Sequence, residues 1–240
     1  MSRRWLSPSR PRVRLFKGFL RPAECATLRA AAASHLRPVE IHNEFNANAT
    51  RRSAHGAWLP RSDVAAKHAL WRSLGFTDLE AEVISRVERR IANAAGIPLI
   101  HGEPSQIIRY RAGSEYTEHP DYFDPHDTEE LANGGQRVAT FLVYLSTVAS
   151  GAGGHTVFAR ASDGPLRIRP REGDAVLWHN VLEDGRPDVR SVHSSETVKR
   201  VEPRAEKWVL SKWLRQRPYE VDVAAFRHSA AQQPRRKQKA

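Results

Sequence analysis

Cysteine is nearly missing from this sequence, in which Cys25 is the single thiol among 240 residues. An intrachain disulfide is therefore excluded, and the composition favours a reducing compartment. Apolar runs are short as well, and none approaches the roughly 18 residues that a membrane-spanning helix needs. The first residues, Met1–Pro8, lack the apolar segment of a secretory signal. The sequence thus predicts a cytoplasmic protein without a membrane anchor.

Acidic residues are outnumbered, with 27 aspartates and glutamates against 38 lysines and arginines, which gives a net charge of +11. A positive net charge of this size indicates either an acidic or polyanionic partner or simply a basic, arginine-rich proteome. The arginines are scattered, and the only dense basic run is Arg235–Lys239. No stripe alternates basic and aromatic residues, so a nucleic acid is the less favoured partner.

The N-terminal part of the chain carries helical signals. One helix is expected after Pro22, which suits a first helical turn. Another is expected between a capping box formed by Thr77 with Glu80 and a stop signal at Gly96. The charged residues of this second helix, and of a shorter helix expected over Asp63–Ser73, are expected to face solvent. The second helix should bury one apolar stripe, namely Leu79, Val83, Val87 and Ile91.

Beyond residue 102 the pattern changes to short apolar runs separated by Gly, Pro, Asn and Asp, which is typical of a β-sandwich or jelly roll. The predicted fold class is α+β, a double-stranded β-helix (cupin-like jelly roll) with N-terminal helices packed on its major sheet. The predicted organisation has four parts: a disordered N-terminus over 1–12, an α/β support region over 13–102, a jelly-roll core over 103–217 and a basic tail over 218–240.

The residues with the clearest chemistry lie in the segment Gln106–Phe123. His119 and Asp121 are two positions apart in a run that Pro120 keeps extended. On a strand, residues two apart project from the same face. An imidazole beside a carboxylate supplies two of the three ligands of a facial His/carboxylate/His iron site.

The third ligand is expected farther along the chain. His193, at the end of a predicted strand Val189–His193, is best placed for this role. His126 and Asp127 are a weaker alternative, because they lie in a polar loop that no strand pattern frames.

A later strand, Lys207–Leu214, adds a lysine to this site. Alternation places Lys207, Val209, Ser211 and Trp213 on one face. A lysine that points into an otherwise apolar barrel needs an anionic partner. A dicarboxylate co-substrate would provide that partner.

Five motifs in this order resemble the prolyl 4-hydroxylase branch of the iron(II)/2-oxoglutarate dioxygenases, and the similarity extends over roughly residues 13–217. The motifs are His-x-Asp at 119–121, Gly-Gly-x-Thr-x-Phe at 153–158, Gly-Asp-Ala-Val-Leu-Trp at 173–178, the late His193, and Lys-Trp-x-x-x-Lys-Trp-Leu at 207–214. The segment from Arg52-Ser53 to Leu59 is also similar to that branch.

The resemblance implies a role for each matching residue. His119, Asp121 and His193 would hold Fe(II), and Lys207 would pair with the distal carboxylate of 2-oxoglutarate. The hydroxyls of Tyr110 and Thr156 would help to hold the same carboxylate, and Trp213 would form the aromatic wall of the pocket.

Two departures from the family pattern stand out. The interval between His193 and Lys207 is longer than usual, which indicates an insertion around Val201–Ala205 and leaves Lys199 as the alternative anchor. His155 stands where the family commonly has Glu or Ala.

The resemblance implies hydroxylation of a C–H bond with O2 as oxidant and ascorbate as protectant of the iron. A prolyl residue of a peptide or protein is the expected substrate, with Pro-rich peptides as first candidates. The loops 42–56 and 122–134 are the expected mouth, and the second is acidic, which would suit a basic peptide. The alternatives are a free amino acid, oxidative demethylation of nucleic acid, or a metal-binding jelly roll that is not an oxygenase; the sequence leaves the oligomeric state open.

Overall fold

The computed structural model describes residues 2–39, 54–63, 68–200 and 205–224. Most of the predicted loop 42–56, nearly all of the insertion predicted around Val201–Ala205 and the basic run Arg235–Lys239 lie outside the described residues. Within the described residues, no helix is long and apolar enough to cross a bilayer.

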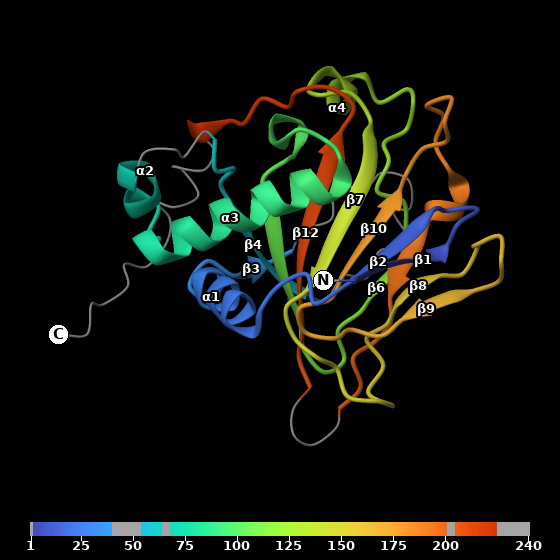
Figure 1. Ribbon diagram of the computed structural model, residues 1–240, viewed down its shortest axis with the longest axis horizontal. Coiled ribbons are helices and arrows are strands. Elements are labelled where there is room, and N and C mark those ends of the chain that lie inside the picture. The colour runs from blue at the N-terminus through green and yellow to red at the C-terminus, as the bar shows by residue number, and fades with distance from the viewer. Residues whose placement is uncertain (1, 40–53, 64–67, 201–204, 225–240) are drawn as a thin grey trace.

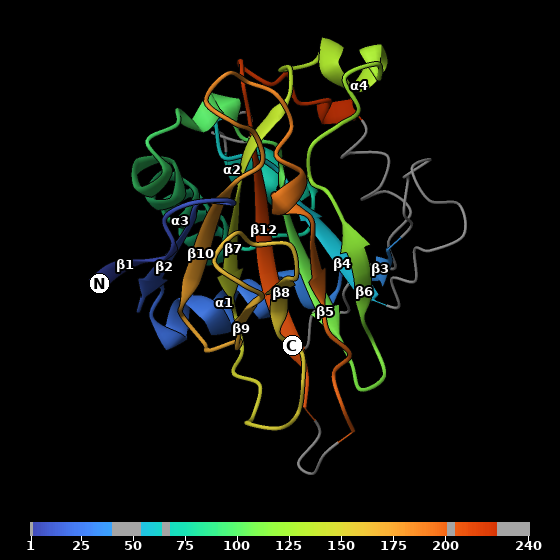
Figure 2. The same ribbon diagram turned by 90° about the vertical axis from the view of Figure 1, so that its right-hand side faces the viewer.

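Two antiparallel sheets face each other and form the framework of the molecule (Figures 1 and 2). Among the described residues, the major sheet has eight strands in the order β1-β2-β10-β7-β12-β5-β4-β3, and the minor sheet has four in the order β6-β11-β8-β9. The major-sheet strands are β1 (Ser2–Ser7), β2 (Val13–Lys17), β3 (Arg37–Pro38), β4 (Ala54–Leu59), β5 (Ser105–Tyr110), β7 (Arg137–Tyr144), β10 (Ala175–His179) and β12 (Lys207–Arg215). The minor-sheet strands are β6 (Tyr116–His119), β8 (Thr156–Phe158), β9 (Leu166–Ile168) and β11 (His193–Ser195). The jelly-roll prediction is confirmed.

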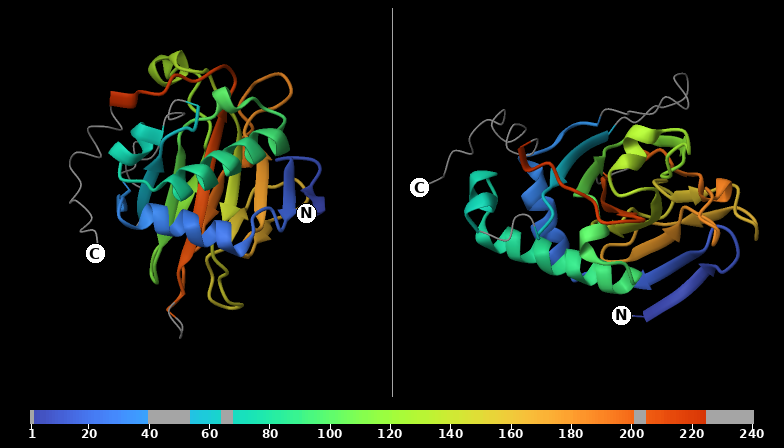
Figure 3. Two further views of the ribbon diagram at one scale, coloured as in Figure 1. Left: turned by 60° about the vertical axis from the view of Figure 1, so that its left-hand side comes forward. Right: turned by 90° about the horizontal axis from the view of Figure 1, so that it is seen from above.

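Two long helices, α1 (Pro22–Ala33) and α3 (Asp78–Ala95), cover the face of the major sheet that is turned away from the minor sheet (Figure 3). Pro22 occupies the first turn of α1, and Thr77 and Glu80 form the expected capping box of α3. Gly96 ends α3 in the left-handed conformation, with φ of 70°, which glycine adopts without strain. The shorter elements are α2 (His68–Ser73), α4 (Thr128–Ala132) and the 3-10 turns Leu99–His101 and Val189–Ser191.

The core consists of two apolar layers, one on each face of the major sheet. Strand β7 contributes to both, because Phe141 packs on the helix side whereas Leu142 and Tyr144 pack between the sheets. A strand buried on both faces is apolar at every position rather than at alternate ones. This explains why the run predicted as a buried strand is continuous in the sequence.

The N-terminus differs from the predicted disordered segment. Residues Ser2–Ser7 form β1, which pairs antiparallel with β2 at the edge of the major sheet. The guanidinium carbon of Arg14 lies 4.1 Å from the ring centroid of Trp5 across this pair. Most side chains of β1 are exposed, so backbone pairing holds the strand and the composition carries no apolar signal for it.

The predicted stripe on α3 is wrong at its first member. Leu79 is 62 % exposed, whereas Val83, Val87 and Ile91 are buried and Ile84 joins them. Residues four apart in a helix are rotated by about 40° beyond a full turn, so three such steps drift by about 120°. Leu79 therefore leaves the buried face.

The expectation that charged residues of α3 face solvent is also wrong at two positions. Glu80 is 6 % exposed and accepts from the Thr77 backbone in the capping box. Glu88 is 1 % exposed, and its carboxylate pairs with Lys212 on β12. This carboxylate lies under the helix, against the major sheet.

Candidate metal centre

Strand pairing in the minor sheet brings the two predicted histidine ligands together. His119 ends β6, His193 begins β11, and the two residues are direct partners in the antiparallel register. Their ring centroids are 4.3 Å apart. Direct partners on neighbouring strands project from the same face, so both imidazoles point into the space between the sheets.

Two local predictions differ from the structure here. The strand β6 ends at His119, so Asp121 lies in the bend after Pro120 rather than on the same strand. Residues Val189–Ser191 form a 3-10 turn rather than a strand, and Asp188 stabilises it by accepting a hydrogen bond from the Arg190 backbone. Asp121 therefore lies in a bend, and His193 lies where β11 begins after a 3-10 turn.

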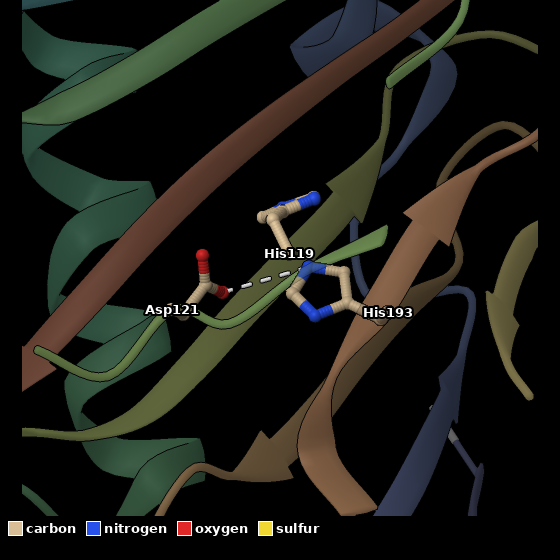
Figure 4. A group of neighbouring side chains, drawn as sticks. All are labelled: His119, Asp121 and His193. Carbon is tan, nitrogen blue, oxygen red and sulfur yellow. Dashed lines mark ion pairs between the residues drawn. The ribbon is translucent and has the colours of Figure 1, made fainter. Parts of the chain in front are cut away.

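Figure 4 shows His119 and Asp121, from the end of β6 and the bend after it, grouped with His193 from the distant strand β11. One candidate ligand atom from each lies within 4.8 Å of the others, and His193 Nε2 is 3.7 Å from Asp121 Oδ2. Within the described part of the chain, these three residues form the one group of histidine, cysteine or acidic side chains whose spacing could hold a metal ion. Each of the three is 7 % exposed, so the group is shielded from bulk water.

The tautomers of the histidines fit metal ligation. His119 Nδ1 lies 2.8 Å from the carbonyl oxygen of Thr117, and His193 Nδ1 lies 3.0 Å from that of Ser191. A carbonyl oxygen only accepts, so each Nδ1 carries the proton and donates it. In the neutral form of each ring the lone pair is therefore on Nε2, as metal-ligating histidines require.

Asp121 is held in place by a buried chain of hydrogen bonds. Thr140 Oγ1 donates to Asp121 Oδ2 at 2.7 Å, and Asn180 Nδ2 donates to Thr140 Oγ1 at 2.9 Å. Burial alone would raise the pKa of Asp121, but His193, His119 and the Thr140 hydroxyl together bring the pKa below its ordinary value. Asp121 is therefore the carboxylate, which is the form that binds a cation.

The same pocket contains the predicted co-substrate residues. Lys207, Tyr110, Thr156 and Trp213 all line the pocket that holds the histidines. Val209 and Ser211 line it too, so the predicted face of β12 is confirmed.

The choice between the two candidate lysines follows from their positions. Lys207 is 1 % exposed and its Nζ donates to Ser195 Oγ at 2.7 Å. Lys199 is exposed on the surface and does not line the pocket. Of the two candidate lysines, Lys207 is therefore the buried one that shares a pocket with His119, Asp121 and His193.

Comparison with known proteins agrees with this geometry. The family sequence model described as 2OG-Fe(II) oxygenase superfamily matches residues 105–215 of this chain. Prolyl 4-hydroxylase 1 of Arabidopsis thaliana is 33 % identical over 217 residues, which cover 86 % of this chain and 70 % of that protein. The chain belongs to the prolyl 4-hydroxylase branch of the Fe(II)/2-oxoglutarate dioxygenases. Prolyl 4-hydroxylase 2 of the same plant is 30 % identical, with 86 % of this chain and 68 % of that protein covered.

Solved structures share the fold of this dioxygenase. The viral collagen prolyl hydroxylase of Paramecium Bursaria Chlorella virus-1, in complex with 2OG, has a TM-score of 0.58 at 24 % identity, covering 85 % of this chain and 95 % of its own. A Pseudomonas putida prolyl-4-hydroxylase has a TM-score of 0.53 at 17 % identity, covering 88 % and 95 %. By family the protein is a 2-oxoglutarate- and Fe(II)-dependent dioxygenase, and these structures show that it has the fold of that family.

The wall of the dioxygenase pocket at Trp213 is reinforced by neighbouring charges and rings. The Arg137 guanidinium carbon is 4.4 Å from the Trp213 ring centroid, and the Trp58 and Trp213 centroids are 5.8 Å apart. Arg137 donates from Nε and Nη2 to the two oxygens of Glu103 at 2.6 and 2.8 Å. This bidentate pair fixes the guanidinium over the indole.

The other histidines noted in the sequence lie outside the site. His155 Nδ1 is 2.8 Å from Glu196 Oε2, and the ring does not line the pocket. His126 is exposed, and Asp127 caps α4 by accepting from the Glu130 backbone.

Sequence reasoning missed two hydroxyls beside the predicted anchor. Ser195 accepts from Lys207, and Tyr144 OH donates to Thr156 Oγ1 at 2.9 Å. Ser195 is two positions after His193 on an extended segment, and this spacing was a usable signal for a shared face. Tyr144 had no such signal, because it sits in an apolar run.

Proposed function

We propose that this enzyme hydroxylates a prolyl residue of a peptide or protein. One substrate C–H, one 2-oxoglutarate and one O2 would give the alcohol, succinate and CO2. The observation that carries the proposal is the buried Lys207 in the same pocket as His119, Asp121 and His193. A metal-binding jelly roll that is not an oxygenase has no need of a lysine there. The similarity to named prolyl 4-hydroxylases supports the prolyl substrate.

His119, Asp121 and His193 would hold Fe(II), which supplies the activation of O2 and the oxidative decarboxylation when it is bound. The chain's own part is to orient and to exclude water. Thr117 and Ser191 fix the two imidazoles through their carbonyl oxygens. The Thr140 hydroxyl orients the carboxylate, so the donor set is arranged before the metal arrives.

Lys207, Tyr110, Thr156 and Trp213 would hold 2-oxoglutarate. The Lys207 ammonium lies 5.3 Å from the centroid of the Tyr110 ring and is enclosed between the sheets. In such a poorly solvated site, an ammonium–carboxylate contact is stronger than in water. Lys207 would therefore fix the distal carboxylate and leave the keto-acid end directed at the metal.

For the substrate, the first candidates are basic, Pro-rich peptides. Support comes from the acidic segment of the predicted mouth, where Glu129 and Glu130 are exposed and Asp124 and Asp127 are half-buried. Arg215 lies 3.6 Å from Glu130 and offsets part of this charge. Peptide binding should weaken as salt is added. An affinity that does not change with salt concentration contradicts this choice.

Ascorbate as protectant of the iron and the cytoplasm as location are further parts of the proposal.

The test begins with anaerobic addition of Fe(II) and 2-oxoglutarate, for which a weak visible charge-transfer band is expected. Lys207→Met should weaken 2-oxoglutarate binding about tenfold or more, since a hydrogen bond to a charged group is lost. The matched control Lys199→Met should bind as wild type. Equal weakening by both variants, or by neither, refutes the assignment of Lys207.

Mass spectrometry then identifies the substrate. The expected result is the gain of one oxygen atom on a prolyl residue of a basic peptide, with succinate formed in equal amount. The same gain on a free amino acid, or loss of a methyl group from a methylated oligonucleotide, would move the substrate to another class and leave the oxidation chemistry in place.

A further inference from the structure

The ammonium group of Lys207 is met by a hydroxyl that neither the sequence motifs nor the family resemblance assigns. Lys207 Nζ donates to Ser195 Oγ at 2.7 Å, and Ser195 is 8 % exposed. A serine oxygen accepts through its lone pairs and also carries one proton to donate. Because an ammonium only donates, the contact with Lys207 leaves the Ser195 proton available to another acceptor in the pocket.

A second hydroxyl lies directly beside the first. Ser195 on β11 and Thr156 on β8 are partners in the antiparallel register of the minor sheet. Both residues line the pocket. Partners in register have their Cβ atoms about 5 Å apart, so the two hydroxyls form one pair on the side opposite Lys207.

Tyr144 sets the direction of the Thr156 hydroxyl. Its OH donates to Thr156 Oγ1 at 2.9 Å from the opposite sheet, and the ring is fully buried. Burial raises the pKa of Tyr144, so the phenol stays protonated and remains a donor. Since the Thr156 oxygen accepts from Tyr144, the Thr156 proton is directed to a different acceptor.

The major sheet also places Tyr144 near the lysine. Tyr144 is the register partner of Val209 on β12, two positions from Lys207 on the same strand face. The Lys207 and Tyr144 hydrogen bonds therefore run from neighbouring positions of the major sheet to neighbouring positions of the minor sheet.

We propose that Ser195 binds the distal carboxylate of a C5 dicarboxylate together with Lys207 and Thr156, and that Tyr144 is a positioning residue acting through Thr156. The proposal rests on the proposed function and deepens it. One ammonium and two hydroxyl protons would converge on a group that offers about four acceptor sites. The Lys207–Ser195 and Tyr144–Thr156 contacts are already formed, so binding needs little further ordering of these side chains.

The test measures binding without turnover. Titration calorimetry of 2-oxoglutarate into the Zn(II)-loaded protein gives a dissociation constant that does not depend on oxidation. Ser195→Ala should weaken binding about 5- to 30-fold, and Tyr144→Phe about 3- to 10-fold, which correspond to one lost hydrogen bond each. Ser195→Thr keeps the hydroxyl and should recover most of the loss.

Two control variants and one kinetic readout separate binding from a general structural effect. Ser162→Ala on the surface and Tyr219→Phe away from Lys207 should bind within about twofold of wild type, because neither residue lines the pocket. In turnover, Ser195→Ala should raise KM for 2-oxoglutarate and leave kcat nearly unchanged. A merely structural role would lower kcat and the melting temperature, and Ser195→Thr would not correct them.

The outcomes distinguish this proposal from the proposed function. If binding requires Lys207 but is unchanged in Ser195→Ala and Tyr144→Phe, the proposal is wrong and the dioxygenase stands. If the variants weaken binding as expected and no prolyl peptide is hydroxylated, the proposal is supported and the prolyl substrate is wrong. A wild-type protein that does not bind 2-oxoglutarate refutes both.

Discussion

Replacing Lys212 by methionine should destabilise this protein by about 3–5 kcal/mol, the usual cost of removing one partner of a buried ion pair. Lys212 is 2 % exposed and Glu88 is 1 % exposed, and Lys212 Nζ donates to Glu88 Oε1 at 2.5 Å. The Glu88 carboxylate also accepts from Ser105 Oγ at 3.0 Å and from the Ser62 backbone at 2.7 Å. Without the ammonium, these two neutral donors would face an uncompensated buried charge.

The substitution Lys212→Met removes the positive charge and changes the shape of the side chain little. The lysine stem is tightly enclosed, because a Cβ at Gly102 would lie 2.5 Å from Lys212 Cε. An unbranched side chain of similar length fits the same channel. Removing both charges in Glu88→Leu/Lys212→Met should cost only about 1–3 kcal/mol, because what is lost is the partner of the Ser105 and Ser62 donors.

Equilibrium urea unfolding of the metal-free protein measures these free energies, with an unchanged slope as the check on two-state behaviour. Glu82→Ala, which removes an exposed pair with Arg86 on the same helix, should change stability by no more than about 0.5 kcal/mol. The reasoning is refuted if Lys212→Met costs less than about 1 kcal/mol, or if the double variant is less stable than either single variant.

Three further outcomes follow from groups elsewhere in the structure. Burial raises the pKa of Cys25 to about 11, so its thiol should react with a disulfide reagent only as the protein unfolds; rapid labelling of the native protein would contradict this. The pKa of His179 is lowered from 6.5 to about 4 by burial and two nearby arginines, so the unfolded chain binds that proton first. Stability should fall as pH drops from 6.5 towards 4, and His179→Gln should remove this part of the dependence in thermal melts. Thr140→Val removes the hydroxyl that Asp121 accepts from and should weaken Zn(II) binding about tenfold in a chelator competition, with Thr140→Ser near wild type.

Periodicity was enough to predict the face of β12 because alternation on a strand is a local property. Lys207 and Trp213 share the pocket as predicted, and both are fixed by residues within one strand. The capping box of α3 and its stop at Gly96 are local too, and both were predicted correctly. These features depend on backbone geometry over a few residues.

What the sequence concealed depends on pairing between distant segments. The contact of Lys212 with Glu88 joins positions 124 residues apart, and nothing in either neighbourhood identifies the partner. The β1–β2 pair is similar, because its exposed side chains resemble those of a disordered segment and only the register shows the strand. The hydroxyl of Ser195 likewise could not be assigned a role without its contact with Lys207, which lies on the other sheet.

Strand β12 carries two buried lysines whose hydrogen-bond partners differ. One lysine contributes to the stability of the fold, and the other is proposed to bind the co-substrate. Lys212, on the helix side, is matched by a carboxylate of the protein. Lys207, on the pocket side, donates to a neutral serine hydroxyl in the place where a ligand carboxylate is proposed to bind. Removing Lys212 leaves the buried Glu88 charge without its ammonium partner, whereas removing Lys207 takes away a hydrogen bond to the Ser195 hydroxyl, a loss of about 1–3 kcal/mol.

We therefore expect Lys207→Met to be clearly more stable than Lys212→Met in the absence of ligand, although the two substitutions are chemically identical. Saturating 2-oxoglutarate should raise the melting temperature of wild type and not that of Lys207→Met, since only a protein that binds the ligand gains stability from it. Equal destabilisation by the two substitutions would mean that the Lys207 charge is as firmly matched within the protein as that of Lys212. The pocket would then hold no site prepared for an anion.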